Sequence, residues 1–193
     1  ERYGKKSDWT ESDSKYIDED EVSDGTGQDN SNGVPGGSTT PGGGTTDVGW
    51  RQDGNTWYFK YPDGNYIKDN WLKWNDKWYL FDSSGRMLTG WQKKNNYWYY
   101  LGENGDMKKG WLQSGNIWYY LNPNDGGPEG AMVTNSWLTI NGKTYFVNES
   151  GIMVEGWYQI EGNYYYFYPG DGSKAVSTSI SGFVLDANGV WQH

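Results

Sequence analysis

Residues 89–111 read TGWQKKNNYWYYLGENGDMKKGW, and this stretch decides the fold. A leading Trp at position 91 is followed seven residues later by an aromatic triplet at 98–100, then by Gly-Asp-Met at 105–107 and by the next leading Trp. Two Asn residues lie between the two aromatic-rich runs. Turn residues of the Asn, Asp or Gly type in such a place favour a β-hairpin. We therefore predict one hairpin here, followed by a looped connection to the next unit.

The same unit recurs from residue 49 onward, with leading tryptophans 21, 20, 20, 26 and 20 residues apart. An insert at 122–130 lengthens the fourth copy and accounts for the spacing of 26. A lone two-stranded hairpin is barely stable in water, but stacked hairpins bury their aromatic faces on each other. No helical periodicity interrupts the pattern. We predict an all-β stack of about six hairpin repeats, led by Trp50, Trp71, Trp91, Trp111, Trp137 and Trp157.

Composition divides the chain of 193 residues into two parts. Residues 1–48 are rich in Gly, Ser, Thr, Asp and Asn, and residues 1–49 hold 11 acidic and 4 basic residues, so −7 of the net charge of −9 lies there. Such a segment buries too little apolar surface to offset its ordering entropy. We predict an acidic spacer over 1–48, with a flexible Gly-rich linker at 33–46, followed by the nearly neutral repeat array over 49–193.

Several functional classes are disfavoured by what the sequence lacks. The chain has no Cys, and its single His is residue 193, so Ser-His or Cys-His catalysis has no base and a His/Cys metal site has no ligands. No Lys/Arg-rich stripe accompanies the aromatic residues, as a single-stranded nucleic-acid groove would require. No apolar run is long enough to span a membrane. We expect no catalytic residue, metal, cofactor or nucleic-acid partner, and we expect any catalytic domain of the parent protein to precede Glu1.

The pattern of Gly-Trp, a Trp-Tyr-Tyr triplet that starts seven residues after that Trp, Gly-x-Met and Gly-Trp resembles the choline-binding (cell-wall-binding) repeats of Gram-positive bacterial surface proteins and phage lysins. The resemblance covers residue 49 to about residue 176, and the tail at 180–191 looks like the C-terminal cap of such proteins. It implies a left-handed solenoid of stacked β-hairpins. It also implies a secreted, non-catalytic module that attaches to the bacterial cell surface through phosphocholine on teichoic or lipoteichoic acid.

Aromatic cages are the expected ligand sites, because a trimethylammonium group has no N–H to donate and is attracted by aromatic faces. The two Trp residues of one hairpin supply two walls if they project to the same side. The middle Tyr of the next triplet points away from its own Trp neighbour and can supply the third wall. We predict the sets Trp50/Trp57/Tyr79, Trp71/Trp78/Tyr99, Trp91/Trp98/Tyr119 and Trp111/Trp118/Tyr145, with Met87, Met107 and Met132 as apolar walls.

The later repeats depart from this pattern. The insert changes how the fifth repeat approaches the fourth set. Thr144 stands where the fifth set needs a Trp, and no aromatic triplet follows Trp157 and Tyr164 of the sixth repeat. We expect no site of the family type in the fifth or the sixth repeat.

Two other functions stay open on the sequence. A carbohydrate-binding array for glucan or a host glycan would use the aromatic residues as platforms flanked by polar side chains, as related repeats in glucan-binding enzymes and clostridial toxins do. A stalk would bury every aromatic residue in its core and only space an upstream domain. Four consecutive repeats keep both Trp positions, as a three-walled cage requires, which favours choline. A homodimer through the terminal repeats is a further expectation from the resemblance.

Overall fold

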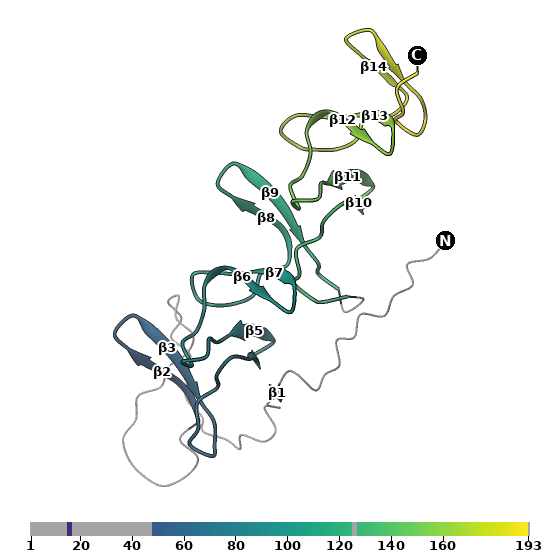
Figure 1. The fold of residues 1–193 in the computed structure, drawn as a ribbon. Helices are drawn as coiled ribbons and strands as arrows, with labels where there is room; N and C mark the ends of the chain where they lie inside the picture. The colour runs from purple at the N-terminus through teal and green to yellow at the C-terminus, as the bar shows by residue number, and fades with distance from the viewer. Residues whose placement is uncertain (1–14, 17–47, 125–126, 193) are drawn as a thin grey trace. The chain divides into compact units, whose positions relative to one another are not determined.

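The computed structural model describes residues 15–16, 48–124 and 127–192. The predicted linker at 33–46, and all of the predicted spacer except 15–16 and 48, lie outside these residues. No α-helix occurs in the described part of the chain, which folds into strands joined by turns and loops (Figure 1). The strands are β1 (Lys15–Tyr16), β2 (Gly49–Asp53), β3 (Thr56–Lys60), β4 (Trp71–Trp74), β5 (Lys77–Leu80), β6 (Gly90–Lys94), β7 (Tyr97–Leu101), β8 (Gly110–Ser114), β9 (Ile117–Leu121), β10 (Ser136–Ile140), β11 (Lys143–Val147), β12 (Gly156–Ile160), β13 (Asn163–Phe167), β14 (Thr178–Ile180) and β15 (Phe183–Leu185).

From β2 onward, each strand pairs antiparallel with its sequence neighbour to form a hairpin. β1 adds to β4 in parallel, with Lys15 opposite Leu72. The hairpin turns use the residues that the sequence indicated, because a type I′ turn needs positive φ at both central positions. Asn95 and Asn96, for example, have φ of 49° and 68°. The predicted all-β fold of successive hairpins is confirmed.

The strand register brings both tryptophans of a repeat to one face of its hairpin. Trp91 lies opposite Tyr100, and Trp98 lies opposite Lys93. Residues paired across a ladder project to the same side, as do residues two apart in a strand. The middle Tyr of the triplet, Tyr99, therefore projects to the other face. This is the arrangement that the cage prediction assumed.

Each connecting loop returns to the preceding hairpins and closes a thin apolar core. The backbone N–H of Met107 donates to the carbonyl of Trp78 at 2.8 Å, and that of Lys108 donates to the carbonyl of Tyr100 at 2.8 Å. From the second repeat on, the residue that follows the triplet is fully buried, so each of these repeats contributes to the core. These residues are Phe81, Leu101, Leu121, Val147, Phe167 and, in the last hairpin, Leu185.

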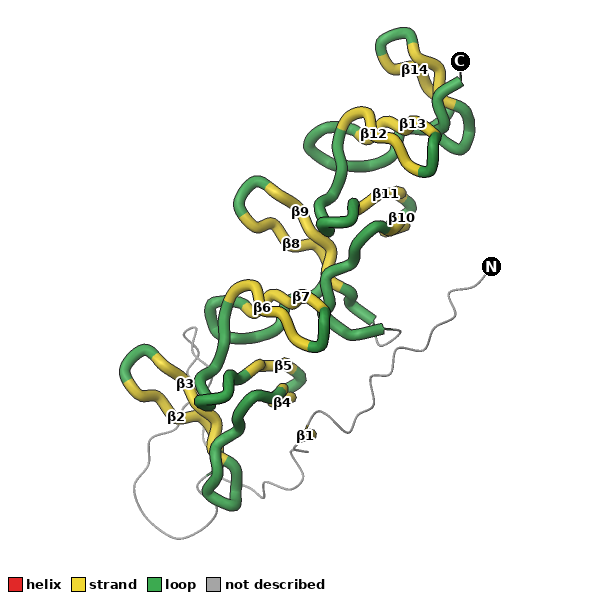
Figure 2. The backbone as a smooth tube through the Cα atoms, in the orientation of Figure 1, coloured by secondary structure: helices red, strands yellow, loops and turns green. Residues whose placement is uncertain are grey.

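The chain divides into two compact units, which are described separately. The first contains residues 1–108 and 126–130, and the second contains residues 109–125 and 131–193. Strands β2 to β7 belong to the first unit and β8 to β15 to the second, and short strands alternate with loops in both (Figure 2). Within the described residues, no helix is long and apolar enough to cross a membrane.

Candidate aromatic binding site

The first predicted set assembles in the first unit but is packed as a core. The ring centroid of Trp50 lies 6.3 Å from that of Trp57, at 82°, and 4.7 Å from that of Tyr79, at 69°. Phe81 stacks on Trp50 at 5.8 Å, and Met87 packs against the same cluster. Trp50 is 5% exposed, as is Trp71 of the second set, so burial of the leading Trp does not distinguish the two sets. The structure thus brings the three predicted walls together and places another ring against them.

The second predicted set has the same geometry and surrounds a cavity. The Trp71 and Trp78 centroids are 6.4 Å apart at 84°, and the Trp71 and Tyr99 centroids are 4.9 Å apart at 70°. Phe81 follows the triplet at 78–80, and Leu101 holds the equivalent position after the triplet at 98–100. The second set therefore has an aliphatic side chain where the first set has an aromatic ring. All three rings line the cavity, and the Trp71 ring stands at a steep angle to each of the other two, an arrangement that can attract a cation from more than one side.

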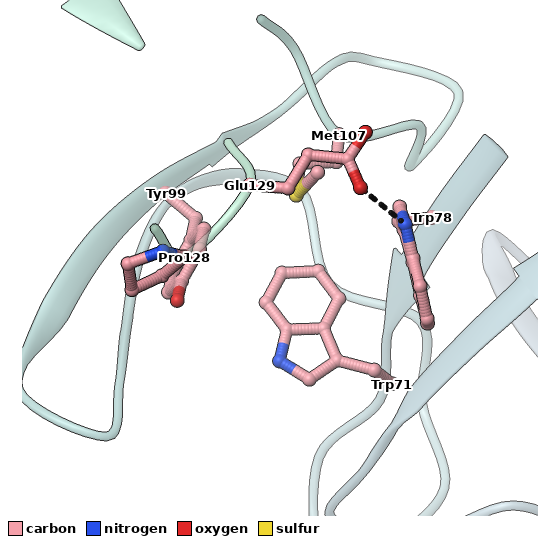
Figure 3. Close-up of a pocket in the computed structure, with 6 residues that line it drawn as sticks. All are labelled: Trp71, Trp78, Tyr99, Met107, Pro128 and Glu129. Atoms are coloured by element: carbon pink, nitrogen blue, oxygen red, sulfur yellow. Dashed lines mark hydrogen bonds between the residues drawn. The ribbon is translucent and has the colours of Figure 1, made fainter. Parts of the chain in front are cut away.

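Residues of the insert complete this cavity (Figure 3). Met107 is one wall, as predicted, and Pro128 and Glu129 of the insert also line the cavity. The Trp78 indole Nε1 donates a hydrogen bond to a Glu129 carboxylate oxygen at 3.1 Å. Sequence reasoning missed Pro128 and Glu129 because the insert was treated only as a spacing change. A signal existed, because Glu129 precedes Gly130 as Asn104 precedes Gly105 in the repeat before.

The fourth predicted set comes together in the second unit. Trp111 lies 6.5 Å from Trp118 at 88° and 5.0 Å from Tyr145 at 68°. Tyr120 packs edge-on against Trp111 at 5.0 Å. The insert therefore leaves the third wall of this set in its predicted place.

The third predicted set takes residues from both units. Trp91 and Trp98 lie on β6 and β7 of the first unit, and Tyr119 lies on β9 of the second. Trp98 is 42% exposed. The assembly of these residues into one cage stays a prediction.

Methionine recurs beside the aromatic sets at one position of the repeat. Met107 lines the cavity of the second set, and Met87 packs on the first set. In the second unit, Met132 forms an isolated antiparallel β-bridge with Leu121. Met153 was not among the predicted walls, yet its N–H donates to the Trp118 carbonyl at 2.9 Å, as that of Met107 does to Trp78. Met153 stands two residues after Gly151, as Met107 stands two residues after Gly105, and this shared spacing could have identified it.

The fifth set, at Trp137, Thr144 and Tyr165, has a lysine, Lys174, in place of that methionine. Lys174 pairs with Phe167, as Met107 pairs with Leu101, and its N–H donates to the Thr144 carbonyl at 2.7 Å. Its ammonium lies 4.9 Å from the centroid of Trp137 and 5.7 Å from that of Tyr165. A cation of the chain itself therefore lies over the two aromatic walls that remain in this set.

The sixth repeat packs against the C-terminal hairpin. Trp191 lies 6.4 Å from Trp157, 6.0 Å from Tyr164 and 5.5 Å from Phe183. Trp157 is still 38% exposed. Trp191 thus serves as an aromatic partner of this repeat, a role that the sequence prediction did not assign to the cap.

The tyrosine walls of the first two sets stay neutral over a wide pH range. Burial raises the pKa of Tyr79 to about 12, with a further contribution from the charge of Asp106. Burial also raises the pKa of Tyr99 to about 12, with a smaller contribution from Tyr97. The described residues contain no cluster of His, Cys, Asp or Glu that could hold a metal ion.

A family model described as "Choline-binding repeat" matches residues 69–107, 88–137 and 133–179, which together span more than half of the chain. The chain belongs to the choline-binding repeat family. A second model, described as "Putative cell wall binding repeat", matches residues 48–66, so the choline-binding repeats extend back to β2 and β3. None of the curated protein sequences compared with this chain matches it.

Solved structures of choline-binding proteins share this fold. Choline binding protein F from Streptococcus pneumoniae is 43% identical, with a TM-score of 0.67, over 76% of this chain and 48% of that one. CbpJ from Streptococcus pneumoniae TIGR4 is 40% identical, with a TM-score of 0.67, over 75% of this chain and 48% of that one. This chain spans about half the length of those proteins. The family resemblance stated for residues 89–111 is confirmed.

Proposed function

We propose that the choline-binding repeats form a non-catalytic attachment module that binds choline or phosphocholine on teichoic and lipoteichoic acids of a bacterial cell surface. The observation that carries the proposal is the cavity lined by Trp71, Trp78 and Tyr99, in which the Trp71 ring stands at steep angles to the other two rings. A quaternary ammonium is recognised by such faces without an ion pair, at about 0.5–2 kcal/mol for each contact.

Repetition supports a polymer as the natural ligand. The fourth set, at Trp111, Trp118 and Tyr145, repeats the ring geometry of the second. Several weak sites on one chain bind a polymer that carries many copies of the ligand far more tightly than they bind the free ligand. Choline binding protein F has also been solved in the presence of a peptidoglycan analogue, which is consistent with a cell-wall context for that relative.

Thermal melting of the 193-residue chain with choline tests the proposal. A ligand that binds only the folded state stabilises it by about 2.7 kcal/mol per site at one hundred times its Kd. Choline should therefore raise Tm, and 3,3-dimethylbutan-1-ol, which has the same shape without the charge, should not. Trp78→Ala should reduce the choline shift, whereas Trp74→Ala should keep it, because Trp74 packs on Phe59 and belongs to none of the sets.

The alternatives give different results. A Tm shift with glucose oligomers and none with choline would contradict the cage and favour a carbohydrate-binding array. No shift with either ligand would favour a stalk. Retention of the protein on choline-substituted resin, and its elution by free choline, would test attachment to a multivalent surface.

A further inference from the structure

The second unit contains a groove of a different kind from the aromatic cavity. Residues of β10, β11, β12 and the adjoining turns line it, and its volume is about 480 Å³, which is in the size range of small-molecule sites. Trp137 and Tyr158 are aromatic residues of its lining, and Trp137 is 36% exposed. Lys174, whose ammonium lies over Trp137, is not among the lining residues. The groove is therefore distinct from the place where that ammonium lies.

Planar polar side chains supply much of the remaining lining. Asn135 and Gln159 carry amides, which both donate and accept hydrogen bonds. Glu149 and Glu161 carry carboxylates, which accept them, and no lysine or arginine lines the groove. All four side chains are exposed. Gln159 donates to the carbonyl of Gly162 at 3.3 Å, which leaves its amide oxygen as an acceptor. The groove thus offers donors and acceptors to a ligand, together with a negative charge.

The equivalent place between the second and third hairpins is bridged by an ion pair. There the Lys94 ammonium donates to the carboxylate and to the carbonyl of Asp69, both at 2.8 Å. Asn135 holds the position of Asp69, two residues before the leading Trp, and Ile160 holds the position of Lys94, three residues after the next leading Trp. Asp69 and Asn135 each donate their backbone N–H, at 2.8 Å, to the loop that follows their own hairpin. The backbone is therefore alike in both places, and the side chains remove the bridge from the later one.

These groups match a neutral sugar better than a phosphate or a quaternary ammonium. A pyranose ring has C–H groups on its faces, which pack on an aromatic ring, and hydroxyls at its rim, which need both donors and acceptors. A phosphate would meet two carboxylates and no cation, and the like charges oppose it. A trimethylammonium group has no N–H or O–H, so the amides and carboxylates of the groove cannot hydrogen-bond to it.

We propose that this groove is a second ligand site that binds a neutral pyranose sugar. Trp137 is the stacking wall, and Asn135 and Gln159 are the hydrogen-bonding residues. The proposal goes beyond choline attachment, because it assigns another class of ligand to another place in the fold. It also differs from a carbohydrate-binding array, in which the aromatic sets themselves would hold the sugar. A polymer that carries both groups would be held at both kinds of site, which raises its overall affinity.

The test follows the indole N–H signal of Trp137 in ¹H–¹⁵N spectra of the whole chain, assigned with Trp137→Phe. The methyl glycosides of glucose, galactose and N-acetylglucosamine are titrated separately, with glycerol 3-phosphate as the anionic control. At least one glycoside should shift this signal to saturation, and glycerol 3-phosphate should not shift it.

Two variants test the hydrogen-bonding residues. Gln159→Ala should weaken glycoside binding roughly fivefold, as expected for the loss of one hydrogen bond. Gln113→Ala is the matched control, because Gln113 is also exposed and two residues after a leading Trp but does not line the groove. Asn135→Gly should weaken binding to a similar extent, and glycine tolerates the φ of 43° at this position.

The sugar site and the choline function fail in different ways. If none of the three glycosides shifts the Trp137 signal, or if Gln159→Ala and Asn135→Gly leave Kd unchanged, the sugar site is wrong. If glycerol 3-phosphate shifts the signal as the glycosides do, the ligand class is wrong. A choline titration of the same samples tests the proposed function separately, through the indole signals of Trp71 and Trp78. Glycosides that shift those two signals and not that of Trp137 would contradict the groove and favour the carbohydrate-binding array.

Discussion

A Cβ atom on Gly105 would lie 2.3 Å from the Sδ atom of Met87, so the glycine leaves the space that the thioether occupies. Gly105 also has φ of 81°, which a side chain disfavours. The same relationship recurs along the chain, where a later glycine covers an earlier methionine. The pairs are Gly130 with Met107, Gly151 with Met132 and Gly172 with Met153.

Gly105→Ala should therefore destabilise the fold by roughly 1–3 kcal/mol, because it adds overpacking to backbone strain. Gly115→Ala is the matched control, since Gly115 has φ of 65° and nothing within 4 Å of an added Cβ. It should cost about 1 kcal/mol, from strain alone. Urea denaturation of both variants measures the difference. Equal losses would mean that Met87 moves away at no cost and that the contact does not hold the repeats together.

The fifth repeat should gain a choline site when its two departures from the pattern are reversed. Thr144→Trp restores the second wall, and Lys174→Met removes the ammonium that lies over Trp137 and Tyr165. Calorimetric titration with choline should give a stoichiometry one higher for the double variant than for the wild type. The single variant Lys174→Met still lacks a wall and should show no added site. An unchanged stoichiometry in the double variant would contradict the idea that these two positions decide the site.

Alkaline pH should weaken the fold partly through Tyr99. Its pKa is about 12 in the folded protein, against 10.0 for an ordinary tyrosine. A raised pKa means that the neutral form is favoured by folding, so this contribution is complete below pH 10 and is lost as the pH rises through 12. Denaturation curves at several pH values should show a smaller alkaline loss for Tyr99→Phe than for the wild type. The same loss in both proteins would show that other tyrosines account for it.

Trp191 should stabilise the C-terminal end of the array. Its ring contacts Trp157, Tyr164 and Phe183, and its N–H donates to the Tyr164 carbonyl at 3.0 Å. Trp191→Ala keeps the backbone bond and removes the ring contacts. Loss of a fully buried Trp ring costs roughly 3–5 kcal/mol. Because the Trp191 ring is only partly buried, we expect a loss of stability below that range. Amide hydrogen exchange should accelerate in β14 and β15 and remain slow in β8 and β9. Unchanged exchange in β14 and β15 would mean that the end of the array does not depend on this ring.

Much of the second set could be predicted from local sequence alone. The Asn75-Asp76 turn fixes the pairing of β4 with β5, because both residues adopt positive φ and close a two-residue loop. Period-2 alternation then separates the faces on which Trp78 and Tyr79 project. The contact of Trp71 with Tyr99 follows once successive hairpins stack.

Other features of the sites depend on contacts that alternation and turn chemistry do not encode. Whether a set is open depends on the volume of every side chain that reaches it, as the ring of Phe81 on Trp50 illustrates. The contact of Lys174 with Trp137 requires the side chain to extend over a ring two hairpins earlier in the sequence. Its alignment with Met153 was visible in the sequence, but the position of its ammonium was not.

By itself, the sequence determined the repeat, the hairpins and the family, because turn residues and alternating aromatic residues act over a few neighbouring positions. Only the tertiary structure decided the chemistry of each site. Trp78 and Glu129 are 51 residues apart in the chain, and their hydrogen bond forms only when the insert returns to an earlier hairpin. Side-chain volume and charge from distant segments meet only in the folded chain, and they determine which aromatic set is filled, which holds its own cation and which carries a carboxylate.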